Sequence, residues 1–420
     1  MTRLDRARRQ TFRSLETPNY RKYLVGQIIS ASGSWIQQIA LTWLVVRLTH
    51  GNGLAVGTVT ALQFTPVLIG GAWAGVLADR LDKRRVLLAT SAGAAVCAAV
   101  MGILVLTNVV ELWMVYVLAA TFGIATALDS PARRSFVTEL VPDHHAANAV
   151  SLNSSVFTAA RVIGPTIAAI IIATAGIGWC FVVYALSFGA VIGALVTLDR
   201  DAIRPSAPVQ REKGQLVAGL HYVWGSTTLR TTLLMTAIIG TLSFNFQVTI
   251  SLMARKVFGG DAGQFASLYA LMSVGAVVAS LYVAHRERVT TRFVTLCALG
   301  LGMMMLSAAV APSLVVFAVL LVPVGATSIA FLSSAGALAQ SHAAPEYRGR
   351  VAALFAVAFL GSTPIGGPII GAISQFFGAR FGIAVGGVTA VLVALIALRA
   401  LRVRADRVVD APSTPRAATA

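Results

Sequence analysis

The chain has 420 residues, of which 57% are hydrophobic and only 12% are charged. A soluble domain carries about 25% charged residues, so this chain lacks the polar surface that water requires. Its mean hydropathy of +0.79 agrees. The net charge of +17 falls in short clusters between apolar runs, without a basic groove pattern, which argues against nucleic-acid binding.

A helix that crosses a bilayer needs about 20 mostly apolar residues. Twelve such segments occur along the chain, six in each half. They are Tyr23–Val46, Leu54–Leu77, Val86–Leu106, Leu112–Leu128, Ser151–Ala173 and Trp179–Leu198, then Leu233–Met253, Phe265–Ala284, Phe293–Val310, Leu314–Leu338, Val351–Phe376 and Ile383–Leu401.

The placement of positive charge tests this count, because cytoplasmic loops are enriched in Lys and Arg. With a cytoplasmic N-terminus, the inner segments carry 28 of the 33 Lys and Arg residues. The outer loops carry four, namely Arg47, Arg255, Lys256 and Arg380. We therefore expect a multi-pass protein of the cytoplasmic (inner) membrane with both termini inside.

The two halves resemble each other at a fixed offset. Pro142, Gly164 and Pro165 in the first half correspond to Pro345, Gly367 and Pro368 in the second, each 203 residues later. Six helices return the chain to its starting side, so the halves are parallel repeats. The sequence predicts an all-α membrane protein of twelve transmembrane helices in two pseudo-symmetric six-helix bundles.

The segments outside the bundles complete the organisation. Residues 1–22 are basic and lack the apolar core of a signal peptide. Residues 199–230 hold a Pro-containing linker and then apolar residues on one helical face, which predict an amphipathic helix on the inner membrane surface or the first turn of helix seven. The bundles are expected at 23–198 and 231–402, and a disordered tail at 403–420.

Arg161 is the most informative single residue. It falls about 13 residues into the fifth helix, roughly 20 Å deep, where a charge normally faces a cavity or a partner. It can bind an anionic group of a substrate, or be satisfied by carbonyls and amide side chains.

Polar side chains at helical spacing suggest a water-filled cavity. They include Gln27, Ser34 and Gln38 in the first helix, Gln63 in the second and Asn245 in the seventh. Such residues also hold helices together by hydrogen bonds, which is the alternative. Asp129 is among the acids nearest to a membrane segment, so proton coupling would involve an acid such as this one.

No catalytic or metal-binding pattern is found. Cys97, Cys180 and Cys297 are scattered singly in apolar runs, and the six His residues form no ligand set. There is no phosphate-binding loop, so ATP is not the expected energy source. We expect a protein that is not an enzyme and carries no cofactor or metal.

Several segments resemble the major facilitator superfamily over nearly the whole chain. The loop from Gly75 to Arg85, with Asp79-Arg80 before a basic cluster, is similar to its signature loop, although Asp82 stands where the family usually has Gly. The resemblance implies a conformational latch formed by Gly75, Asp79, Arg80 and Arg84. Plain positive-inside charge is the alternative for the basic residues.

Other segments resemble the bacterial efflux branch that contains macrolide exporters and the enterobactin exporter. They are Gly33-Ser34-Trp35-Ile36-Gln37-Gln38, Asp129-Ser130-Pro131-Ala132-Arg133 and Arg348-Gly349-Arg350-Val351. Gly164-Pro165 resembles the Gly-Pro motif of efflux members, and Gly367-Pro368 repeats it. Both pairs are expected to bend their helices and allow close helix contact, or simply to pack.

This resemblance implies proton-driven export of an amphiphilic drug, macrolide or siderophore by alternating access. Its partners would be a small amphiphilic substrate, protons and the lipid bilayer. An importer or lipid flippase of the same fold is the alternative, and a non-transporting membrane scaffold or receptor is a third possibility.

Overall fold

The computed structural model describes residues 12–204, 215–286 and 289–409. These residues form helices and no strand. The first half contains a short turn, η1 (Arg13–Glu16), and six long helices. These are α2 (Pro18–Leu48), α3 (Gly53–Arg80), α4 (Lys83–Leu106), α5 (Leu112–Glu139), α6 (Asp143–Thr174) and α7 (Ile177–Val196).

The second half begins with the short helix α8 (Gln215–Gly225), in the segment predicted to hold an amphipathic helix. Six spans follow, two of which are interrupted. The elements are α9 (Thr227–Ser243), α10 (Phe246–Leu252), η2 (Met253–Val257), α11 (Ala262–Ala284), α12 (Thr291–Ala309), α13 (Leu314–His342), η3 (Pro345–Tyr347), α14 (Arg348–Leu360), α15 (Thr363–Phe376) and α16 (Ala379–Val409).

Local sequence explains where the helices begin. Pro18 opens α2 at a position where its missing N–H costs nothing. The side chain of Asn52 accepts a hydrogen bond from the Ala55 N–H at the start of α3. Asp82 does the same for the N–H groups of Arg84 and Arg85, which explains the departure from the family's usual Gly.

Eleven helices or helix pairs in the described residues are long and apolar enough to cross a membrane. The first helix, α2, is longer than most of them but falls outside this set. Gln27, Gln37 and Gln38 interrupt its apolar sequence, and we attribute the lower hydropathy to them. The predicted all-α fold is confirmed, and the predicted count of twelve is approximately right.

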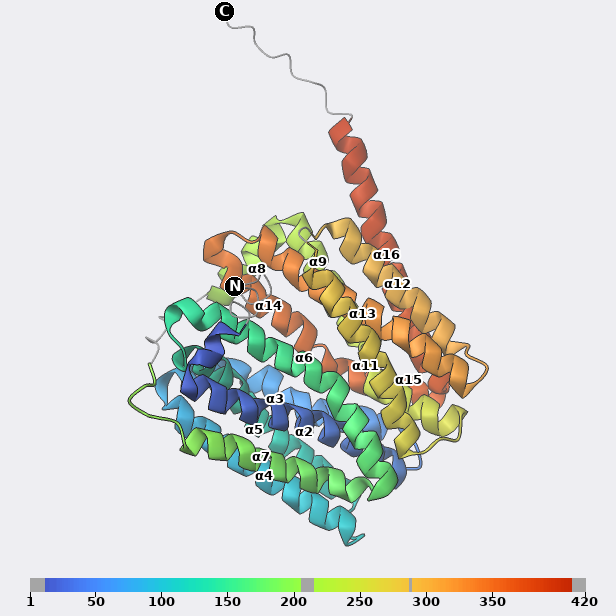
Figure 1. Ribbon diagram of the computed structural model, residues 1–420. Helices are drawn as coiled ribbons and strands as arrows, with labels where there is room; N and C mark the ends of the chain where they lie inside the picture. The colour runs from blue at the N-terminus through green and yellow to red at the C-terminus, as the bar shows by residue number, and fades with distance from the viewer. Residues whose placement is uncertain (1–11, 205–214, 287–288, 410–420) are drawn as a thin grey trace, which may run out of the picture.

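The six helices of each half pack mainly against one another and form two bundles side by side (Figure 1). The internal repeat is visible in the backbone. Gly176 joins α6 to α7 with φ of 92°, and Gly378 joins α15 to α16 with φ of 101°, a conformation that favours glycine. Corresponding turns of the two halves are therefore built alike.

The bundles meet along two helix pairs, α3 with α15 and α6 with α11. We name the side where α2 begins and α16 ends the terminal face, and the opposite side the far face. Near the far face α3 and α15 touch at backbone distance, because a Cβ at Gly53 or Gly57 would overlap the carbonyl oxygens of Gly371 or Gly367. Toward the terminal face this contact ends, and Gly70 and Gly71 have no such neighbour within 4 Å.

Two spans of the second half are broken where the sequence predicts continuous helices. The seventh span is interrupted at Phe244 and Asn245, and the eleventh at Gly361 and Ser362. Pro364 explains the second break, since proline cannot donate to a carbonyl of the preceding turn. The expected bend at Gly367-Pro368 therefore lies after the observed interruption, and Pro368 sits inside α15.

The predicted ends also need correction. The first helix starts at Pro18 rather than Tyr23, since Tyr20 and Tyr23 are fully buried in the first bundle. The last helix continues to Val409, through the first residues of the tail expected to be disordered. Residues 1–11 and 410–420 lie outside the described part of the chain.

Candidate functional site

A cavity of about 740 Å³ opens in the first bundle, between α2, α4, α5, α6 and α7, with Phe64 of α3 at its edge. Its wall holds polar and charged side chains as well as aromatic rings. Arg134, Val150 and Asn153 of its lining lie near the ends of α5 and α6 at the terminal face, so the cavity leads toward that face. We take it as the candidate substrate site.

The predicted polar stripe of α2 forms one wall of this cavity. Gln27, Ser30, Ser34 and Gln38 all line it. The Ser34 hydroxyl donates to the Ser30 carbonyl at 3.0 Å. The amide nitrogen of Gln27 is buried without a hydrogen-bond partner.

Gln38 also joins the two bundles. Its amide nitrogen donates to Gln63 of α3 at 3.1 Å and to Gln247 of α10 at 3.0 Å. Gln63 is buried and its own amide nitrogen has no partner. Gln38 thus combines both roles considered for these residues, lining the cavity and holding helices together.

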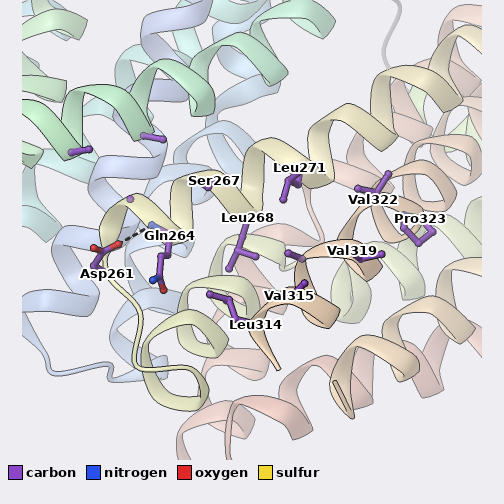
Figure 2. Close-up of a pocket in the computed structure, with 14 residues that line it drawn as sticks. Asp261, Gln264, Ser267, Leu268, Leu271, Leu314, Val315, Val319, Val322 and Pro323 are labelled. Atoms are coloured by element: carbon purple, nitrogen blue, oxygen red, sulfur yellow. Dashed lines mark hydrogen bonds between the residues drawn. The ribbon is translucent and has the colours of Figure 1, made fainter. Parts of the chain in front are cut away.

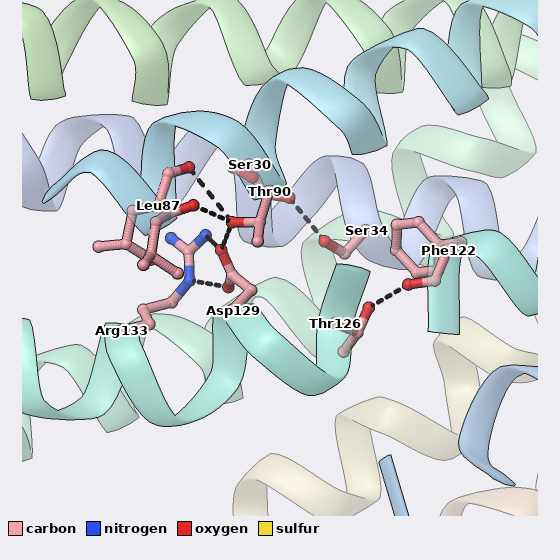
Figure 3. Close-up of polar contacts among 9 residues, drawn as sticks. Ser30, Ser34, Leu87, Thr90, Phe122, Thr126, Asp129 and Arg133 are labelled. Carbon is pink, nitrogen blue, oxygen red and sulfur yellow. Dashed lines mark hydrogen bonds and ion pairs between the residues drawn. The ribbon is translucent and has the colours of Figure 1, made fainter. Parts of the chain in front are cut away.

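An ion pair on α5 lies in the same cavity (Figure 3). Asp129 accepts two hydrogen bonds from Arg133, from Nε to Oδ2 and from Nη2 to Oδ1, the latter at 2.7 Å. Thr90 of α4 donates to the same carboxylate at 2.9 Å. A bidentate pair of this kind neutralises both charges in a partly buried place.

The sequence missed the pairing of Asp129, because the fourth helix was expected to end at Leu128. In the structure α5 continues to Glu139, so the aspartate lies inside a helix. The signal was present, since acid and base four residues apart share one face of a helix. Because the sequence prediction places Asp129 in a loop, the four-residue spacing to Arg133 is not read as one face of a helix.

Arg161 lies deeper, on α6. Its guanidinium sits over the Trp35 ring of α2, 5.2 Å from the centroid. Trp35 in turn packs against Tyr269 of α11, with ring centroids 6.1 Å apart. The arginine therefore stands where the first bundle meets the second.

Asn245, expected in the cavity wall, is placed elsewhere. It is buried at the break between α9 and α10, and its amide nitrogen donates to the Thr241 carbonyl at 2.7 Å. That carbonyl lies in the last turn of α9, where the helix leaves carbonyls without partners. The asparagine side chain thus satisfies a carbonyl at the helix break.

The two Gly-Pro pairs occupy different places. A Cβ at Gly164 would overlap Trp35 of α2, so the first pair packs within its own bundle. Gly367 and Pro368 lie against Gly57 of α3, so the second pair packs between the bundles. Pro165 is inside α6, which remains one helix.

The residues expected to form a latch are found at the terminal face. Gly75 is buried in α3, and the side chain of Asp79 lies outside the described part of the structure. Arg84 is buried and donates to the carbonyls of Leu195 at 2.7 Å and Val196 at 3.3 Å. It therefore caps α7 instead of pairing with an acid.

Two further groups complete this region. Arg80 is exposed, and no hydrogen bond or ion pair joins it to another described residue. Lys83 forms an ion pair with Glu139, which ties α4 to the end of α5 and which the sequence did not indicate. In the conformation seen here, these contacts stay within the first bundle.

A larger groove of about 880 Å³ lies between α6, α11 and α13 (Figure 2). Its lining is almost entirely apolar, and Leu271, Val315 and Val319 are exposed on the outer surface. Its one acid, Asp261, accepts from the Gln264 N–H at 2.8 Å and caps α11. Its remaining polar side chains, Gln264 and Ser267, are neutral, so the groove offers no charged group beyond the capping Asp261.

Comparison with known proteins agrees with this architecture. The chain is 25% identical to the staphyloferrin A transporter of Staphylococcus aureus (strain NCTC 8325 / PS 47) over 250 residues, 59% of this chain and 62% of that protein. It thus spans a little under two thirds of that relative. It is 24% identical to macrolide efflux protein A of Streptococcus pyogenes over 374 residues, 85% of this chain and 89% of that protein.

Among solved structures, the chain is similar to a bacterial homologue of the human lysosomal transporter Spinster in an inward-facing, unoccupied conformation. The TM-score is 0.72 at 15% sequence identity, covering 92% of this chain and 97% of the other. This likeness shows the fold.

The family model described as transmembrane secretion effector matches residues 9–418. Nearly the whole chain is covered, so the resemblance expected from the motifs is confirmed, as is the expectation that the protein is not an enzyme. The chain belongs to the transmembrane secretion effector family of the major facilitator superfamily and is a multi-pass membrane protein.

Proposed function

We propose that this protein is a transporter that exports small amphiphilic molecules across the cytoplasmic membrane, driven by the proton gradient. The observation that carries the proposal is the ion pair of Asp129 and Arg133 inside the cavity of the first bundle. A macrolide efflux protein among its relatives supports the direction.

The ion pair offers a physical route to coupling. Protonation of Asp129 removes its negative charge and with it the attraction that holds Arg133. The guanidinium is then free to turn, and the local packing of α4 against α5 changes because Thr90 shares the carboxylate. Proton binding and a conformational change are thereby linked at one residue.

Alternating access follows from the two-bundle construction. Each bundle moves as a unit, with the boundaries 23–198 and 231–402, and residues 199–230 connect them at the cytoplasmic side. The contact of α3 with α15 closes the far face in the conformation described here. Opening that contact while closing the terminal face would carry the cavity's contents outward.

The direct test compares dye and macrolide accumulation in cells with and without the gene, before and after a protonophore is added. Lower accumulation with the gene, abolished by the protonophore and by Asp129→Asn, is expected. Export that continues without the gradient would reject proton coupling, and equal accumulation with and without the gene would reject export.

Orientation needs its own experiment. A single cysteine replacing Arg85, whose side chain is 83% exposed, marks the terminal face. An impermeant maleimide should label it only after the cells are opened. A cysteine at the exposed His50 of the α2–α3 turn should be labelled in intact cells. The reverse pattern contradicts cytoplasmic termini.

A further inference from the structure

The face of α6 that lines the cavity continues to Arg161. Asn153, Ser154 and Phe157 line the cavity at helical spacing, and Arg161 follows one turn beyond Phe157 on the same face. Arg161 is not itself among the residues that line the cavity, and the residue as a whole is only partly exposed. It therefore lies just beyond the deep end of the cavity.

The charge of Arg161 is uncompensated within the described residues. No carboxylate lies within ion-pair distance, and no hydrogen bond reaches its nitrogen atoms. The guanidinium lies over the face of Trp35, which favours a cation, and close enough to Tyr269 for an electrostatic interaction, but neither neighbour is a carboxylate. A guanidinium inside a membrane protein without an anion is costly, so the position favours a ligand that brings one.

The remaining charges of the cavity do not change this balance. Asp129 is the sole acid in its described lining, and both of its oxygens are occupied by Arg133. Arg134 also lines the cavity, is exposed and has no acidic partner among the described residues. The lining therefore has an excess of positive charge, before Arg161 is counted.

The wall around these charges is suited to an amphiphile. Phe64, Phe122, Phe157 and Phe188 present aromatic rings to the cavity. A molecule with an apolar body and an acidic end can bury the body against the rings and place its charge at the arginine.

We propose that this cavity takes amphiphilic organic anions, and that the carboxylate or similar acidic group of the substrate pairs with Arg161. The inference rests on the proposed function and narrows its substrate class. Binding at Arg161 would also affect the second bundle, because Trp35, which lies under Arg161, packs against Tyr269 of α11. An anion that draws the guanidinium off the ring alters a contact between the bundles.

Two xanthene dyes of opposite charge test the proposal on the purified full chain in nanodiscs. Carboxyfluorescein is anionic and rhodamine 123 is cationic, on related ring systems. Fluorescence anisotropy should show tighter binding of carboxyfluorescein. Arg161→Gln should weaken that binding about tenfold, the size expected when a charged hydrogen bond is lost, and Arg161→Lys should retain most of it.

Controls separate this result from general charge effects and misfolding. Arg292→Gln, at an exposed position on α12, should leave both dyes unchanged. Rhodamine 123 binding in Arg161→Gln should be equal or tighter, which also shows that the variant is folded. Failure of carboxyfluorescein to bind, tighter rhodamine binding by the wild type, or equal carboxyfluorescein binding in Arg161→Gln would each overturn the proposal.

Transport by the same protein in vesicles distinguishes a wrong substrate class from a wrong proposed function. If rhodamine 123 moves in a gradient-dependent manner while carboxyfluorescein does not, the exporter function stands and the anionic substrate class is wrong. If neither dye nor any macrolide moves, the proposed function itself fails.

Discussion

Arg80 and Arg84 lie four residues apart, at the end of α3 and the start of α4, and have different surroundings. Arg84 is buried and donates to two carbonyls at the end of α7, whereas Arg80 is exposed. Replacing Arg84 with Gln leaves these carbonyls short of a charged donor, so we expect a loss of about 1–3 kcal/mol of stability. Thermal unfolding in detergent measures it. Arg80→Gln is the matched control and should melt like the wild type, and equal melting of both variants would contradict the capping role.

The pair of Asp129 and Arg133 can be separated into its structural and functional parts. Asp129→Asn alone leaves the Arg133 charge without its partner in a partly buried place, which destabilises the bundle. Adding Arg133→Gln removes that charge, so the double variant should recover much of the lost melting temperature. Transport should stay absent in both, because the carboxylate proposed to couple proton binding to transport is gone. Recovery of gradient-driven transport in the double variant would assign coupling to another residue.

For single residues, the sequence could predict which side chains are polar inside the membrane, but not what each one contacts. Gln27, Ser34 and Gln38 line the cavity because one helical face carries them, a relation that spacing reveals. Asn245 has the same spacing but serves a helix break, which depends on how α9 packs against the eleventh span. The cap formed by Arg84 likewise depends on α7, more than 100 residues away.

The pairing of α3 with α15 is a property of two helices whose facing residues are glycines. A methyl group at Gly57 would overlap the Gly367 carbonyl and Pro368, so Gly57→Ala should push the helices apart at the far face. Transport should fall by about tenfold or more, as closure on that side becomes incomplete. Dye export and labelling of far-face cysteines by a permeant reagent measure the effect.

Gly193 of α7 provides the control for that substitution. Nothing lies within 4 Å of a Cβ built there, so Gly193→Ala should fold and transport normally, with slightly higher helix stability. If Gly57→Ala also transports normally, the close contact in the described conformation is not needed for the cycle.

Helix positions follow from apolar runs, but interruptions follow from less regular signals. Eleven spans were found where long apolar segments predicted them. The break at Gly361 and Ser362 was visible in principle, since Gly361-Ser362-Thr363-Pro364 holds strong helix breakers. Phe244 and Asn245 carry no comparable signal. There, Phe244 packs against Phe246, Phe331 and Phe359, a tertiary arrangement that periodicity alone does not reveal.

The described residues join the two bundles closely at the far face, and a covalent link there should hold that side closed. A Cβ at Gly367 of α15 lies 3.5 Å from the Cβ of Thr60 of α3, within the range of a disulfide, so cysteines at these two positions can form a disulfide between the bundles toward the far face. Cys97, Cys180 and Cys297 are first replaced by alanine to prevent other pairings. Oxidation should stop transport while substrate still binds from the terminal face, because the far face can no longer open. Reduction should restore transport, and each single-cysteine variant should be insensitive to oxidant. Undiminished transport by the oxidised double variant would mean that the bundles need not separate at the far face, and alternating access between them would be wrong.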